Sequence, residues 1–157
     1  MTFQAVPLAR DLFAPLFDLP DAALAAHRAV RVRADAKPGF PCRISLADAE
    51  PGEDLLLVNF EHQAADSPYR SSHAVYVRAH ADEAMLPPDV LPPYFAGRTI
   101  SLRAFDRDGM IVGADLSQGE DAAPAIETLL ATPGAAYLHA HFAKYGCYAC
   151  RIDRVQG

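Results

Sequence analysis

The sequence predicts an α+β fold built on a mainly antiparallel sheet. Segments typical of strands are joined mostly by turns or loops, which favours antiparallel pairing over a doubly wound parallel sheet. Helical patterns are confined to the N-terminal part and to one segment before the last pair of strands. The length of 157 residues favours one domain, residues 1–157.

The first elements are short. Residues 3–8 are predicted to form a short strand or an extended lead-in, and residues 11–19 and 21–29 form two predicted helices. Asp21 follows a proline and precedes a run of Ala and Leu, a pattern typical of a helix start. Alternating Val and Arg then predict a half-buried strand at residues 30–34.

The middle of the chain is richer in strand patterns. Residues 42–46 predict a weak strand, 55–60 a central strand buried on both faces, and 74–79 a further strand. The segment 85–93 contains four prolines and predicts an irregular connection.

The C-terminal part contains two predicted strand pairs with a helix between them. Residues 99–105 and 110–116 form a hairpin, because the residues between them have turn chemistry and end in Gly109, which tolerates a positive φ. Residues 121–131 form a helix that a Pro-Gly pair ends, and residues 135–142 and 147–154 form the last two strands.

Composition excludes several classes of protein. Hydrophobic residues make up 51% and charged residues 22%, which is ordinary for a globular domain. The net charge is −6 and no basic stripe occurs, so nucleic acid and anionic membranes are poor partners. No apolar run has the length of a membrane span, and the first residues do not resemble a signal peptide. With only three cysteines, we expect a cytoplasmic protein with reduced thiols.

Histidines supply the first candidate site. His139 and His141 are two residues apart on a predicted strand, so both imidazoles project from one face. His62 and His73 flank a Ser-rich loop that could bring them together. His62, His139 and His141 are candidate ligands of a divalent metal such as zinc. The alternative is that each histidine is a hydrogen-bonded polar residue at a strand end.

Acid/base or nucleophilic chemistry is a second interpretation. His139, His141 and His73 are candidate proton-transfer groups, and Cys147 is a candidate nucleophile beside Gly146. Cys147 and Cys150 have the C-x-x-C spacing, but on a strand such residues point to opposite faces, which opposes a redox pair or a zinc knuckle.

Arginines on predicted strands supply candidate anion ligands. Arg43, Arg103 and Arg151 could converge on a carboxylate or phosphate through their planar guanidinium groups. Tyr69 and Ser72, in the loop before His73, are further candidate ligand-binding residues. The alternative is that the arginines are solvated or paired with acidic residues.

Several motifs together resemble a bacterial family of uncharacterised proteins, the domain-of-unknown-function family 1203. They are FPCR at 40–43, EPGE at 50–53, LVNFEHQ at 57–63, SPYRSSHA at 67–74, LRAFD at 102–106, GM at 109–110, HAH at 139–141 and GCYA at 146–149. The resemblance implies no activity. The family pattern has Ala more often than Cys at position 150, which argues against Cys150 as a necessary ligand.

Two classes of function follow from the residues. The first is a small-molecule site in which histidines and arginines bind an anionic compound or perform acid/base or metal-assisted chemistry. The alternative is a non-catalytic interaction domain that forms a homodimer through an exposed apolar patch.

Overall fold

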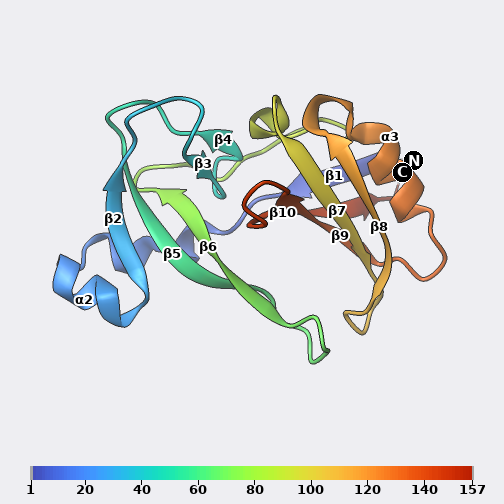
Figure 1. Cartoon of the computed structure of the whole chain (residues 1–157), viewed down its shortest axis with the longest axis horizontal. Coiled ribbons are helices and arrows are strands. Elements are labelled where there is room, and N and C mark those ends of the chain that lie inside the picture. The colour runs from blue at the N-terminus through green and yellow to red at the C-terminus, as the bar shows by residue number, and fades with distance from the viewer. Residues whose placement is uncertain (1, 157) are drawn as a thin grey trace.

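Two five-stranded sheets and a few short helices make up the protein, and the α+β prediction with mainly antiparallel strands is confirmed (Figure 1). The structure is a computed structural model that describes residues 2–156. In Figure 1 the first sheet stands on the right with both ends of the chain, and the second stands on the left.

The first sheet is wholly antiparallel. Its strand order is β1-β10-β9-β7-β8. The bounds are Thr2–Val6 for β1, Thr99–Phe105 for β7, Ile111–Gln118 for β8, Tyr137–Phe142 for β9 and Tyr148–Val155 for β10. β9 therefore lies in the middle of this sheet, with hydrogen-bonded neighbours on both sides.

The second sheet contains one parallel pair. Its order is β2-β5-β6-β3-β4, and only the pairing of β3 with β6 is parallel. The bounds are Ala29–Arg33 for β2, Pro41–Cys42 for β3, Ala47–Asp48 for β4, Asp54–Gln63 for β5 and Ser71–Arg78 for β6.

The helices are shorter than predicted. The segment 11–19 divides into a 3-10 turn η1 and the helix α1, because Pro15 lacks the N–H for a continuous helix and lies in the first turn of α1. Arg28 has a φ of +52°, which ends α2 before position 29. The bounds are Arg10–Leu12 for η1, Ala14–Phe17 for α1, Asp21–Ala26 for α2, Pro93–Phe95 for η2, Gly119–Asp121 for η3 and Ala123–Leu130 for α3.

Two strand predictions need correction. Residues 42–46 do not form a strand, since β3 ends at Cys42 and the chain turns through residues 43–46. The strand predicted at 55–60 extends to Gln63, and it is not buried on both faces along its length, because Leu57 is half-buried and Asn59 is exposed. Part of one face of β5 is therefore open to solvent.

The two faces of the first sheet differ in character. One face packs against α3 in the larger apolar core, which contains Leu102, Ile126, Leu138, Ala140 and Ile152. The other face carries polar and aromatic side chains. The far end of the long β5–β6 hairpin approaches this second face (Figure 1).

Specific contacts fix the hairpin on the first sheet. Gln63 donates a hydrogen bond to the hydroxyl of Tyr137, with 3.0 Å between Nε2 and the oxygen. The Ser67 hydroxyl donates to the carbonyl of Gly109 at 2.9 Å. Gly109 has a φ of +77°, as its turn position predicts, and a Cβ there would lie 2.4 Å from Cβ of Ala65. Glycine therefore permits both the turn and the close approach of the hairpin.

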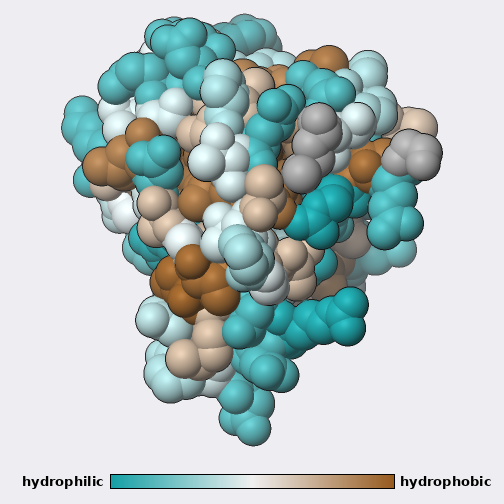
Figure 2. Space-filling view, turned by 90° about the vertical axis from the view of Figure 1, so that its right-hand side faces the viewer, coloured by the Kyte–Doolittle hydropathy of each residue, from teal (hydrophilic) through white to brown (hydrophobic). Residues whose placement is uncertain are grey.

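The face of the molecule seen in Figure 2 is mainly hydrophilic. Figure 2 shows the side of the molecule at the right of Figure 1, where hydrophobic residues form small groups among hydrophilic ones. Exposed apolar side chains such as Leu12, Val30, Met85 and Leu116 belong to different segments. Within residues 2–156, no helix is long and apolar enough to cross a membrane.

Candidate functional site

Strand β9 places His139 and His141 on the polar face of the first sheet. Both lie in an intact antiparallel ladder, where residues two apart share a face. His139 is paired across the sheet with Arg103 on β7 and Arg151 on β10. His141 is paired with Tyr148 on β10. The neighbouring strands therefore surround the two imidazoles with cationic and aromatic side chains.

The third histidine comes from the other sheet through a β-bulge. The register of β5 and β6 shifts between Glu61 and Gln63, and His62 is the additional residue. A bulge changes the direction in which a side chain projects, and bulges are frequent beside active sites. A second register shift, between Tyr148 and Cys150, occurs in β10 of the first sheet.

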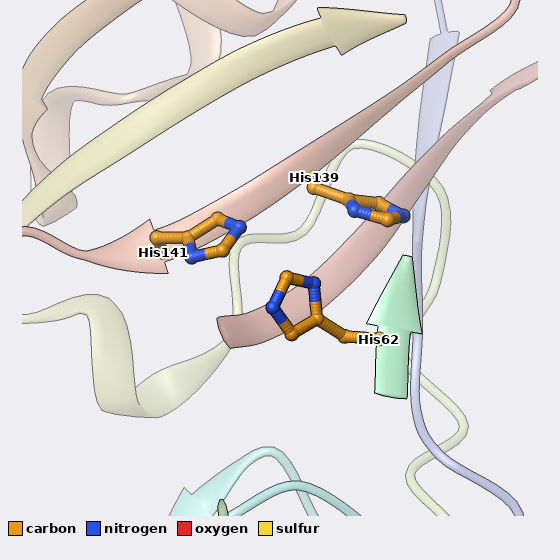
Figure 3. Close-up of side chains that lie close together, drawn as sticks. All are labelled: His62, His139 and His141. Atoms are coloured by element: carbon orange, nitrogen blue, oxygen red, sulfur yellow. The ribbon is translucent and has the colours of Figure 1, made fainter. Parts of the chain in front are cut away.

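Together, His62, His139 and His141 form a compact imidazole cluster (Figure 3). One ring nitrogen from each can be chosen so that all three lie within 4.8 Å of one another. The ring centroid of His62 is 5.0 Å from that of His141 and 6.1 Å from that of His139. In Figure 3, His139 and His141 project from one strand and His62 reaches them from the opposite side.

Burial keeps these imidazoles neutral. His139 and His141 are 4% and 2% exposed, and His62 is half-buried. Loss of hydration disfavours the charged ring and lowers the pKa of His139 and of His141 to about 3, and that of His62 to about 4. Neighbouring imidazoles and Arg103 lower these pKa values further. At neutral pH all three rings therefore carry lone pairs.

The hydrogen bonds of His141 define its tautomer. Its Nδ1 lies 3.0 Å from the carbonyl oxygen of Gly146, which can only accept, so Nδ1 carries the proton. Its Nε2 then has the lone pair and lies 3.4 Å from Nη1 of Arg103, which can only donate. The backbone carbonyl thus orients the ring and leaves Nε2 as an acceptor or metal ligand.

Two buried nitrogens of the cluster have no partner. Nδ1 of His62 and Nδ1 of His139 make no hydrogen bond to any residue of the described chain. Such atoms are uncommon in folded proteins, and a bound ion or water is a usual explanation. The cluster therefore fits a Lewis acid, such as a metal ion, that nitrogen ligands would bind.

Aromatic side chains that the sequence interpretation did not select form the walls of the cluster. Tyr148 stacks on His62 with 5.0 Å between centroids and 7° between ring planes. Tyr137 and Phe105 contact His139 at centroid distances of 5.3 and 5.1 Å. Tyr148 follows Cys147 directly in the sequence, but nothing local indicates that it faces His62, because the bulge in β10 determines that direction.

The donor set resembles that of a three-histidine metal centre. Three neutral imidazoles with one open position are a familiar catalytic zinc set, and ligand nitrogens around tetrahedral zinc are about 3.3 Å apart. Nitrogens spread over up to 4.8 Å would have to move closer together to reach that spacing. Arg103 opposes a bare cation, because its guanidinium contacts Nε2 of His141. A cation together with an anionic ligand would satisfy both the imidazoles and Arg103.

Other candidate residues lie outside the imidazole cluster. His73 on β6 is half-buried, and it lowers the pKa of both His62 and His141. Arg151 is exposed, pairs with Asp153 at 2.6 Å and covers the Tyr137 ring. The pairing matches the alternative interpretation of that arginine.

The loop residues are more remote from the imidazoles. Tyr69 is 40% exposed and lies in a T-shaped arrangement with Phe105, with 6.2 Å between centroids. Ser72 is exposed opposite Glu61. Neither contributes to the cluster of nitrogens.

Arg43 and Cys147 line a different space. A cleft of about 700 Å³ lies between the sheets, and His62, His139 and His141 are not among its lining residues. Arg43 is buried there in the turn after β3 rather than on the predicted strand. Cys147 is half-buried, whereas Cys150 is 1% exposed and belongs to the apolar core, where burial raises its pKa to about 12. The three cysteines are unpaired, so the C-x-x-C segment is not a disulfide.

Fold and site together define a mainly antiparallel α+β protein with a largely buried three-histidine cluster between two sheets. The chain belongs to the family described as "Protein of unknown function (DUF1203)", whose model matches residues 39–154. This membership confirms the resemblance inferred from the motifs. No curated protein and no solved structure matches the chain.

Proposed function

We propose that His62, His139 and His141 bind a divalent metal such as zinc and that this centre acts on a small anionic molecule held by Arg103. The observation that carries the proposal is the approach of three neutral imidazoles from two sheets, two buried and one half-buried, with one nitrogen from each inside a 4.8 Å span. A set of only nitrogen ligands suits zinc and similar metals rather than calcium or magnesium.

The protonation state favours metal binding. Metal ligands must be deprotonated, and these imidazoles are already neutral well below pH 7. The hydrogen bond from His141 to the Gly146 carbonyl holds one ring in the tautomer that presents Nε2. Metal binding at neutral pH therefore needs no proton loss from these rings.

Arg103 supplies the argument for an anionic substrate. Its guanidinium is half-buried and has no acidic partner among residues 2–156. Burial lowers its pKa from the usual value, yet arginine stays charged at neutral pH. A substrate carboxylate or phosphate beside the metal would pair with this charge. The chemistry that fits is polarisation of the bound anion or activation of a water molecule.

Elemental analysis and calorimetry test the metal centre. Purified protein should bind about one zinc ion per chain, and His62→Ala should weaken binding by about 100-fold or more, because one of three ligands is lost. The double variant His139→Ala/His141→Ala should bind no zinc at this site. His80→Ala, which removes an exposed imidazole outside the cluster, is the matched control and should bind zinc like the unmodified chain. Circular dichroism checks that each variant is folded.

Two results would contradict the metal centre. One is the absence of stoichiometric zinc binding by folded protein at micromolar concentrations. The other is unchanged affinity in folded His62→Ala. Arg103→Gln separates the two parts of the proposal: it should retain or improve zinc binding but weaken binding of an anion such as acetate to the zinc-loaded protein.

Homodimer formation is the alternative function. The exposed apolar side chains among residues 2–156 are distributed over separate segments, which gives this alternative less support than the imidazole cluster gives the metal centre. Light scattering after size-exclusion chromatography tests it directly, and a dimer at micromolar concentration would favour it.

A further inference from the structure

A second feature, the cleft between the two sheets, contains a buried cation without an acidic partner. Arg43 is 1% exposed, and within residues 2–156 it takes part in no ion pair. A buried charge that lacks a counter-ion is costly, so proteins usually pair it. Arg43 also lines the cleft, where a ligand could reach it.

Neutral groups satisfy only part of the Arg43 side chain. Nε donates to the carbonyl of Tyr148 at 2.8 Å and Nη1 donates to the carbonyl of Pro41 at 2.6 Å. The guanidinium carbon lies 5.1 Å from the Phe142 ring centroid. Nη2 makes no hydrogen bond to any described residue, and it is not fully buried. It is therefore the nitrogen that can meet a ligand in the cleft.

Arg98, which also lines the cleft, shows how a neighbouring cation is paired. Its two terminal nitrogens donate to the two carboxylate oxygens of Asp48 at 2.9 and 2.7 Å. Its guanidinium carbon is also 5.1 Å from the Phe142 centroid. The two arginines thus share one aromatic ring, but only Arg98 has a counter-ion. The unpaired charge in this cleft belongs to Arg43 and, nearer the surface, to Lys144.

The other residues that line the cleft indicate what the rest of the ligand should be. The cleft has a volume of about 700 Å³, which suits a small organic molecule rather than a bare ion. Leu57, Tyr76 and Phe142 offer apolar and aromatic walls, and no Asp or Glu lines the cleft. His73 adds a buried Nδ1 without a partner. An apolar body with one anionic group would match this combination.

We infer that the cleft between the sheets binds a small organic anion, a carboxylate or phosphate on an apolar or aromatic body, with Arg43 as its buried counter-ion. This site is additional to the histidine centre. It needs no metal, because none of the proposed metal ligands lines it.

Titration of labelled protein followed by amide NMR spectra tests the inference. The probes are benzoate, phenyl phosphate and the neutral analogue benzyl alcohol, added to metal-free protein from which the chelator has been dialysed. Signals of Gly39, Gly97 and Cys147, which line the cleft from three different segments, should shift and saturate with an anion but not with benzyl alcohol. A comparison of benzoate with phenyl phosphate identifies the preferred anionic group.

Variants distinguish this site from unspecific binding. Arg43→Met should weaken anion binding by about 10- to 100-fold, the usual effect of losing a charged hydrogen-bond donor. Arg107→Met, which removes an exposed cation from the β7–β8 turn, is the control and should bind like the unmodified chain. If Arg43→Met does not fold, Ala74→Phe decides the question, because it fills the cleft from an exposed position on β6 and should abolish binding.

Any of three results would overturn the inference. They are the absence of saturable shifts at the cleft, equal shifts with benzyl alcohol, and unchanged anion affinity in folded Arg43→Met or Ala74→Phe. Because the protein is metal-free, failure of the histidine centre to bind zinc would not alter these outcomes, and failure of the cleft would not affect the zinc experiment.

Discussion

Acidification should destabilise the fold through the buried imidazoles of His139 and His141. In the folded chain their pKa is about 3, whereas an imidazole in an unfolded chain has a pKa of about 6.5. Between these two values the unfolded chain binds more protons than the folded chain, so stability falls as pH falls. The contribution is fully present above the unfolded pKa and is lost progressively below it.

The size of this effect follows from the same two pKa values. Each imidazole should lower the free energy of unfolding by about 2 kcal/mol between about pH 7 and pH 5. His139 and His141 together should therefore cost about 4 kcal/mol, and half-buried His62 adds a smaller amount. A typical domain has a stability of about 5–15 kcal/mol, so this loss should be easily measured.

Urea unfolding followed by circular dichroism at the two pH values measures the effect, with metal removed throughout. The variant His139→Phe keeps an aromatic ring beside Tyr137 and Tyr148 but removes one titrating group. Its loss of stability between the two pH values should be smaller than that of the unmodified chain by about 2 kcal/mol. His80→Gln, which changes an exposed histidine, should show the same pH dependence as the unmodified chain.

An equal loss of stability in the unmodified chain and in folded His139→Phe would refute this reasoning. It would mean that His139 does not change its proton affinity on folding, and therefore that its imidazole is hydrated in solution. The support that a neutral cluster gives to metal binding would then be removed.

Two further predictions concern the hairpin contact and the thiols. Gly109→Ala should lower the free energy of unfolding by about 2–4 kcal/mol, because the new Cβ would overlap that of Ala65 and φ is positive there. The control is Gly134→Ala, where φ is also positive but a Cβ would have no neighbour within 4 Å. It should cost only about 1–2 kcal/mol in the same urea assay. Iodoacetamide should modify Cys147 in the native protein before it modifies Cys150, because Cys150 is 1% exposed and its raised pKa keeps the thiol protonated. Mass spectrometry of the labelled peptides measures the order, and modification of Cys150 first would contradict the prediction.

Local sequence patterns were sufficient for much of the fold. Turn residues ending in Gly109 predicted the β7–β8 hairpin, and the order of strand and helix patterns predicted a mainly antiparallel α+β protein. Both depend on interactions close in the chain. Two local predictions were wrong. Pro15 divides the helix predicted at residues 11–19, and the segment 42–46 forms a turn, in which Arg43 is buried, instead of a strand.

The candidate site was only partly visible in the sequence. The spacing of His139 and His141 on one strand fixed a shared face, because side chains alternate along a strand. His62 was the candidate third ligand from the sequence, but spacing could not establish that it reaches the pair, since it does so through a bulge in the other sheet. Which arginine contacts the imidazoles was equally undecided, and the structure selects Arg103.

The sequence by itself therefore determined the strand class, the hairpins and a pair of imidazoles that face the same way, all of which follow from backbone periodicity and turn chemistry. Only the tertiary structure brought His62, a candidate ligand from the sequence, against this pair, stacked Tyr148 on its ring and buried Arg43 in a separate cleft. The physical reason is that two β-bulges and the packing of one sheet against the other set the directions of these side chains. Neither feature can be predicted from the residues next to the site in the sequence.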